Sequence, residues 1–222
     1  MPRYRIEFRK EGMARFISHL DLVRTLERAM RRAGLPLAFS RGFNPHPRFS
    51  LGAPLPVGVK GEREYLDLEL VTALPEDEIK GRLNEQLPGG LEVTRVWSIP
   101  GDAPALMATL EKATYRVDLR LVRAITPEDL RKIIDGLLAL PEIIITRRSG
   151  DKKEKTLDIR PGIHALSGRV EGDRVTLEMC LAVGSRATVR PEEVVQVLAE
   201  RFGLPVADEQ PGVSRTGLYC GG

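Results

Sequence analysis

The order of hydrophobic and polar positions predicts strands and helices that alternate along the chain. Residues 4–9 alternate apolar and charged side chains, as a half-buried strand does. Leu22, Leu26 and Met30 recur at helical spacing, and a helix over 18–33 is predicted between an N-cap serine and Gly34. The rest of this half is predicted as an extended piece around 48–51, strands over 64–71 and 91–99, and a helix over 75–87.

The second half of the chain repeats this order of elements with extra strands. We predict strands over 115–121, 143–147, 157–159 and 213–219, a hairpin over 168–182, and helices starting at Pro127 and at Pro191. The order β-α-β-β-α-β is that of the ferredoxin-like motif. The sequence therefore predicts an α+β protein of two tandem ferredoxin-like (βαββαβ) halves with antiparallel sheets. The predicted boundaries are 1–100 for the half with a basic helix and a Pro/His loop, 101–112 for a linker, and 113–222 for the other half.

The amino-acid composition limits the classes of protein to which the chain can belong. The 222 residues are 42% hydrophobic and 29% charged, which is ordinary for a globular chain. No apolar run approaches the roughly 20 residues of a transmembrane helix, and the first ten residues contain no apolar signal-peptide core, so we expect a cytoplasmic protein. The two cysteines, Cys180 and Cys220, do not have metal-ligand spacing. We predict no cofactor and no metal site.

Charge is distributed unevenly along the chain. Residues 1–60 contain 12 basic and 4 acidic side chains, whereas the remainder contains 22 basic and 27 acidic ones. A basic lobe on a mildly acidic body is typical of a protein that contacts a polyanion. Most of these basic residues are arginines, which suit bidentate phosphate contact. A solvated, arginine-rich helix face is the alternative interpretation.

The candidate site residues gather in and after the basic helix. His46 lies between Pro45 and Pro47, and these prolines stiffen the backbone around it. No catalytic residue can be assigned, but His46 and His19 are candidates for general acid/base work, and they would share a site if the loop folds back over the start of the helix. Phe43 and Phe49 could stack a base, although we interpret them as core residues. The predicted nucleic-acid contacts are Arg24, Arg28, Arg31, Arg32, Arg41, Asn44, His46, Arg48, Arg160 and Arg215.

Several motifs resemble those of a known family. They are RFISHLD, RAGLPLAFSRGFNPHPRFSLGAPLPVGV and EYLDLEL in the first half, and LDIRPGI and SRTGLY in the second. They resemble the radical-SAM-linked bacterial domain of unknown function, which occurs alone or attached to B12-binding radical SAM proteins. The basic helix and the FNPHPRFS loop are more distantly similar to CRISPR repeat-RNA endonucleases and related RAMP proteins, whose C-terminal glycine-rich loop is absent here. The resemblance implies a radical SAM protein as partner and a connection with RNA metabolism.

Three functions follow as hypotheses. The first is an accessory RNA-binding protein, for structured RNA or tRNA, that works with a radical SAM enzyme. The chain has no Cys-x3-Cys-x2-Cys arrangement, so we do not expect it to be a radical SAM enzyme itself. The second is a metal-independent RNA endonuclease that uses His46 or His19. The third is a protein-interaction adaptor without nucleic acid.

Overall fold

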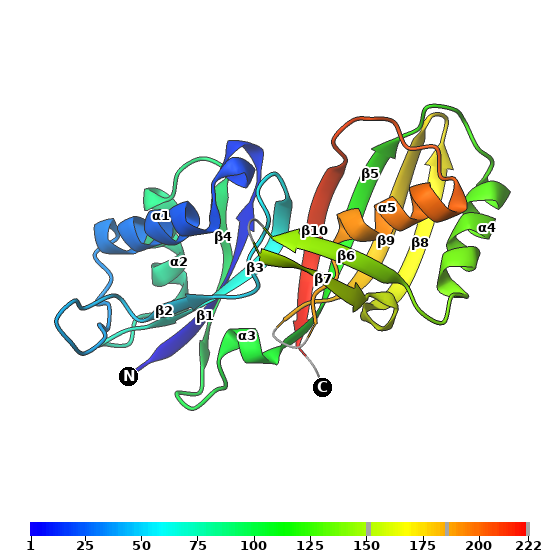
Figure 1. Ribbon diagram of the computed structural model, residues 1–222. Coiled ribbons are helices and arrows are strands. Elements are labelled where there is room, and N and C mark those ends of the chain that lie inside the picture. The colour runs from blue at the N-terminus through cyan, green and yellow to red at the C-terminus, as the bar shows by residue number, and fades with distance from the viewer. Residues whose placement is uncertain (150–151, 185–186, 221–222) are drawn as a thin grey trace. The chain divides into compact units, whose positions relative to one another are not determined.

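The chain divides into two compact units that are not simply its two halves. The computed structural model describes residues 1–149, 152–184 and 187–220 (Figure 1). The first unit consists of Met1–Leu110 together with Arg215–Gly222, and the second of Glu111–Ser214. This division differs from the predicted boundaries at the end of the chain, where the last strand contributes to the first unit.

The first unit is built on an antiparallel sheet. β1 pairs with both β4 and β3, and β3 also pairs with β2 and lies next to β10 in the strand order. The elements are β1 (Arg3–Lys10), η1 (Gly12–Phe16), α1 (His19–Arg32), β2 (Phe49–Leu51), β3 (Lys60–Glu69), α2 (Glu76–Gln86), β4 (Leu91–Ile99), α3 (Leu106–Thr109) and β10 (Gly212–Cys220).

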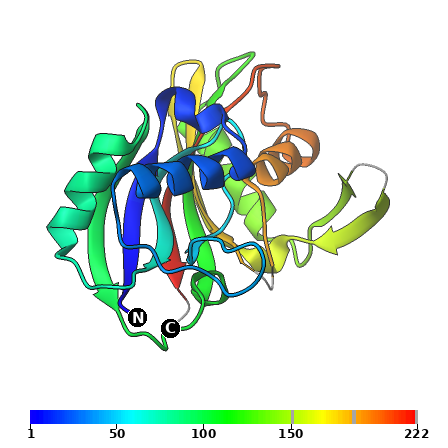
Figure 2. The ribbon, with the colours of Figure 1, turned by 90° about the vertical axis from the view of Figure 1, so that its left-hand side faces the viewer.

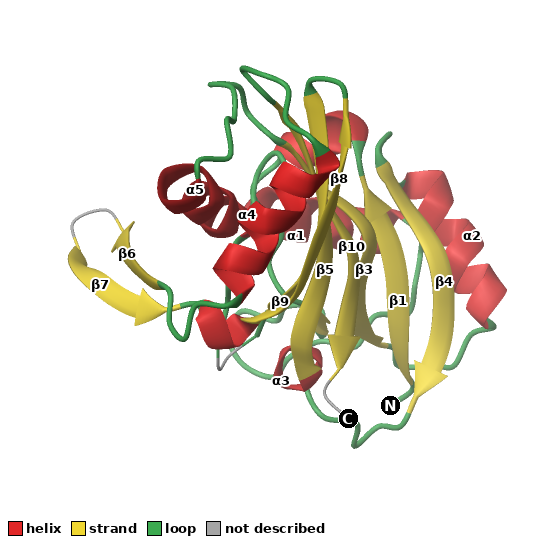
Figure 3. Cartoon of the chain, turned by 90° about the vertical axis from the view of Figure 1, so that its right-hand side faces the viewer, coloured by secondary structure: helices red, strands yellow, loops and turns green. Residues whose placement is uncertain are grey.

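Helices α1 and α2 cover one face of this sheet, as Figure 2 shows; Figure 3 shows the strands from the other side. Tyr4, Ile6 and Phe8 alternate along β1 and are buried under the helices. The predicted apolar face of α1 is confirmed at Leu22 and Met30, which are buried in the same core. Burial of both sets of side chains holds the helices against the sheet.

The second unit has a three-stranded antiparallel sheet in the order β5-β9-β8, and a separate hairpin of β6 and β7. Both strands of this hairpin extend further than predicted, because backbone pairing continues into a highly charged segment whose side chains do not alternate in polarity. The elements are β5 (Leu110–Arg120), α4 (Pro127–Leu138), β6 (Ile144–Ser149), β7 (Lys152–Asp158), η2 (Arg160–Gly162), β8 (Ile163–Glu171), β9 (Arg174–Ala182) and α5 (Pro191–Phe202).

The predicted α+β class with antiparallel strands is confirmed, since the strand pairs given above are antiparallel. The arrangement as two ferredoxin-like halves stays a prediction. Within the part of the chain that the structure describes, no helix is both long and apolar enough to cross a membrane.

A group of three charged side chains is buried inside the first unit. Lys10, Glu64 and Arg215 are 0%, 4% and 1% exposed. The Arg215 guanidinium forms a bidentate ion pair with Glu64, with its Nε 2.8 Å from Oε1, and donates a 2.6 Å hydrogen bond to the Ala53 carbonyl. Burial lowers the pKa of Lys10, whose Nζ donates to the Ile17 carbonyl. The Glu64 carboxylate therefore pairs with one buried cation, Arg215, and opposes the lowering of the pKa of a second, Lys10.

Candidate nucleic-acid interface

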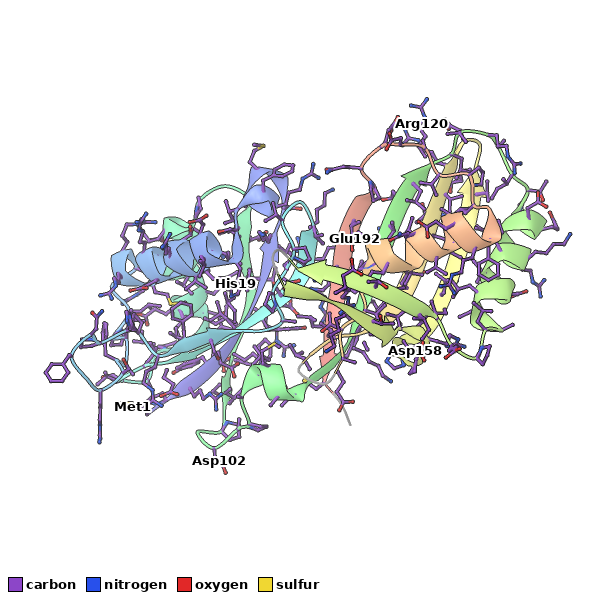
Figure 4. All side chains as sticks on the ribbon, viewed as in Figure 1. Met1, His19, Asp102, Arg120, Asp158 and Glu192 are labelled. Carbon is purple, nitrogen blue, oxygen red and sulfur yellow. The ribbon has the colours of Figure 1, made fainter. Side chains whose placement is uncertain are left out.

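The first turn of α1 fixes the position of His19. Ser18 is the N-cap, and its Oγ accepts a 3.1 Å hydrogen bond from the Asp21 N–H, as the sequence predicts. His19 is therefore the first helical residue, and Figure 4 labels it at this end of the helix. Val23 and Glu27 follow at intervals of four residues, so all three side chains lie along one stripe of α1.

The Pro/His loop is closed at its base by hydrogen bonds between Ser40 and His46. The Ser40 N–H donates to the His46 carbonyl at 2.9 Å, and the His46 N–H donates to the Ser40 Oγ at 3.0 Å. Gly42, at the tip, has a φ of +128°, which glycine adopts readily. His46 is thus held at the base of the loop, and Arg41 and Asn44 are exposed at its tip.

His19 and His46 line one cavity of about 420 Å³, as a shared site would require, and their function there stays a prediction. Both histidines lie within the first unit, 27 positions apart along the chain. The remaining lining residues come from α1, from the segment around β2 and from α3: Val23, Glu27, Pro47, Phe49, Leu51, Gly52, Pro54 and Met107.

Glu27 is the acidic side chain that lines this cavity, and Arg31 positions it. The Arg31 guanidinium donates to Glu27 Oε1 from Nη2 at 2.8 Å and from Nε at 3.2 Å. The same guanidinium lies over the Phe39 ring, 5.2 Å from its centroid. Arg31 therefore has two contacts within the protein, one of which orients the Glu27 carboxylate, and its contact with nucleic acid stays a prediction.

The other arginines of the first unit that are predicted to contact nucleic acid differ in their exposure and in their partners within the protein. Arg28 and Arg41 are exposed and have no ion-pair or hydrogen-bond partner among the described residues. Arg24 lies 3.4 Å from Asp21 and keeps 68% of its side chain exposed. Arg48 is 48% exposed but is paired with Glu69 at 3.1 Å, and Arg32 donates to the Gln86 carbonyl at 2.7 Å.

Two residues that the sequence predicted to contact nucleic acid are not part of the candidate interface. Arg215 is 1% exposed and its guanidinium is engaged by Glu64, so it has no surface to offer a nucleic acid. Arg160 belongs to the second unit, where its guanidinium donates to the carbonyls of Leu138, Leu140 and Ile163. We therefore remove both from the candidate interface, because their guanidinium N–H groups already donate to groups within the protein.

The two phenylalanines of the loop segment differ in burial. Phe49 is half-buried, packs against the core and lines the cavity. Phe43 is fully exposed at the loop tip, so its interpretation as a core residue was wrong. An exposed aromatic ring two residues from Arg41 is a candidate for stacking on a base.

Among the lining residues that sequence reasoning did not single out are Val23, Glu27 and Met107. The helical spacing from His19 was a signal for the first two, since residues four apart share a face. Nothing in the sequence connects Met107, on the short helix α3, to this cavity. Within the described ranges no group of three or more His, Cys, Asp or Glu residues is arranged to hold a metal ion.

Comparison with known proteins gives a family and a fold. The family described as an uncharacterized protein conserved in bacteria (DUF2344) matches residues 3–191. No curated protein matches the chain. Among solved structures, a chain of a Cbf5-Nop10-Gar1 complex aligns with 97% of this chain at a TM-score of 0.56 and 12% identity. A chain of the archaeal box H/ACA sRNP Nop10-Cbf5 complex aligns with 97% at 0.52 and 11%.

These structural neighbours are longer proteins. The present chain covers 48% of each of them, so it spans about half their length. At 11–12% identity the likeness shows a shared fold and assigns no residue.

Proposed function

Because the chain belongs to DUF2344, a bacterial family described only as uncharacterized, we propose a function from its own residues: it is an accessory RNA-binding protein. The RNA is a structured RNA or tRNA, and it is held for a radical SAM enzyme. The family motifs quoted from the sequence support this choice of partner. Membership of the archaeal neighbour in an sRNP adds weak support for RNA.

One observation carries the proposal. His19 and His46 line a single cavity, and exposed arginines lie on the same two elements that supply these histidines. Arg28 lies on α1 with His19, whereas Arg41 lies on the loop with His46. Cationic side chains without intramolecular partners can neutralise phosphates without first breaking an ion pair.

RNA binding is expected to weaken steeply with salt. Four phosphate contacts on a single strand would lower the association constant about 100-fold between about 0.1 M and about 0.5 M salt, because bound counterions are released from the RNA. Fluorescence anisotropy with a labelled tRNA and with a labelled single-stranded RNA measures this slope. Absence of binding at the lower salt concentration would refute the proposal and favour the adaptor without nucleic acid.

A metal-independent RNA endonuclease is the second candidate, and the meeting of two histidines in one cavity favours it. One imidazole can accept the proton of a 2′-hydroxyl while the other protonates the leaving oxygen. Labelled RNA incubated with the protein in EDTA is then expected to be cut, and the His46→Ala variant should lose this cleavage. Intact RNA after prolonged incubation with the unmodified protein would exclude this activity.

A further inference from the structure

The side chains that line the cavity between α1 and the β2 segment indicate what kind of ligand it can bind. Its lining is mostly apolar, with Val23, Phe49, Leu51 and Met107 among the contributors. Of the residues that the structure describes, the ionisable side chains lining it are His19, Glu27 and His46, and neither lysine nor arginine is among them. A carboxylate repels a phosphate, and no guanidinium or ammonium group among these residues offsets it, so the lining suits an uncharged, largely apolar group better than a phosphate.

Glu27 lines this cavity and has a carboxylate oxygen that can accept a hydrogen bond. Both hydrogen bonds from Arg31 go to Oε1. Oε2 of the same carboxylate receives no hydrogen bond from any described residue, so it can accept one from a ligand. The two imidazoles can each donate or accept, depending on their protonation. The cavity therefore combines apolar walls with hydrogen-bonding groups at a few positions.

Cationic side chains lie outside the cavity on the elements that form it. Arg24 and Arg28 project from α1, and Arg41 from the loop that carries His46. A ligand that matches this layout has a flat, apolar body with N–H groups at its edge, attached to a chain of negative charges. A nucleobase on its sugar–phosphate backbone has these properties.

We propose that this cavity binds a single unstacked RNA base, with an N–H group of the base donating to Glu27 and the neighbouring phosphates held by the outer arginines. This inference rests on the proposed RNA-binding function and adds to it the state of the RNA. A base cannot enter the cavity while it is stacked and paired in a duplex. Single-stranded or bulged RNA is therefore the ligand, and duplex RNA is bound only through its phosphates.

The test compares one 15-nucleotide RNA containing all four bases as a single strand and as a perfect duplex. The unmodified protein is expected to bind the single strand at least about tenfold more tightly at equal salt, because base contacts add to phosphate contacts. Val23→Trp fills the cavity and should weaken binding of the single strand at least about fivefold while leaving duplex binding unchanged. Met107→Trp fills it from another element and should act in the same way.

Val122→Trp is the matched control, because Val122 is 70% exposed in the second unit and lies outside the cavity. Glu27→Gln tests the hydrogen bond without changing the shape of the cavity. Thermal unfolding shows which variants remain folded, and RNA binding is compared among those variants.

The outcomes separate the two proposals. If the protein binds no RNA, both the proposed function and this inference fail. If it binds RNA with the expected salt dependence but does not distinguish single strand from duplex, the base-binding cavity is wrong and the proposed function stands. The same conclusion follows if the folded variants with a filled cavity bind single strands as tightly as the Val122→Trp control.

Discussion

Glu64→Gln is expected to lower the free energy of unfolding by about 3–5 kcal/mol, because it removes the carboxylate that pairs with buried Arg215 and favours the charged form of buried Lys10. Gln has nearly the same shape as Glu, so the loss reports on charge rather than on packing. Arg215 would keep its hydrogen bond to the Ala53 carbonyl but lose its ion pair. Urea denaturation followed by circular dichroism measures the difference.

The matched control for this substitution is Glu62→Gln. Glu62 lies on the same strand and is exposed, so its replacement should change the free energy of unfolding by less than about 0.5 kcal/mol. Combining Glu64→Gln with Lys10→Met should recover part of the loss, because it removes one of the two buried cations that the Glu64 carboxylate favours. Equal stability of Glu64→Gln and Glu62→Gln would contradict the buried ion pair.

The Glu64→Gln variant should also regain stability as the pH rises. Burial already lowers the pKa of Lys10, and the carboxylate of Glu64 opposes this effect. Without that carboxylate, folded Lys10 loses its proton at a still lower pH, whereas unfolded Lys10 keeps its proton up to about pH 10.4. The unfolded state then binds more protons in this range, so stability rises with pH.

The second large effect concerns RNA affinity. Replacing Arg41 and Arg48 together with Ala should weaken RNA binding at least about tenfold at low salt and make its salt dependence shallower, since two phosphate contacts are lost. Arg48→Ala also frees the carboxylate of Glu69, which then repels the RNA. Anisotropy titrations at several salt concentrations give both quantities.

A double substitution in the second unit serves as its control. Arg123→Ala with Arg131→Ala removes the same charge from exposed positions. This variant should bind RNA with nearly unchanged affinity if the first unit forms the interface. Equal weakening in the two double variants would mean that net charge, and not the loop, determines binding.

Local signals in the sequence predicted most of the helix boundaries. Ser18 and Gly34 bracket α1, and α5 begins at Pro191 and ends before Gly203, which has a φ of +70°. These signals depend on residues within one or two turns, so they can be identified without knowledge of tertiary contacts. The strands of the β6–β7 hairpin were predicted too short because their extension depends on pairing rather than on polarity.

The candidate site was predicted only in part. Proline on both sides of His46 and the charge excess in the first 60 residues indicated the loop and the basic helix. The burial of Arg215 depends on a partner 151 positions away, which periodicity cannot reveal. Phe43 was assigned to the core because its side chain is hydrophobic. In the structure it is exposed at the tip of a loop that closes at Ser40 and His46, and the sequence pattern does not reveal this closure.

The ion pair between Glu64 and Arg215 also affects the order in which the chain can fold during synthesis. The first unit takes one of its buried cations from near the end of the chain, after the whole of the second unit has been translated. Domains commonly fold in N-terminal order as they leave the ribosome. The first unit cannot form the ion pair between Glu64 and Arg215 until the second unit has been synthesised, so we expect it to complete its folding only after that point.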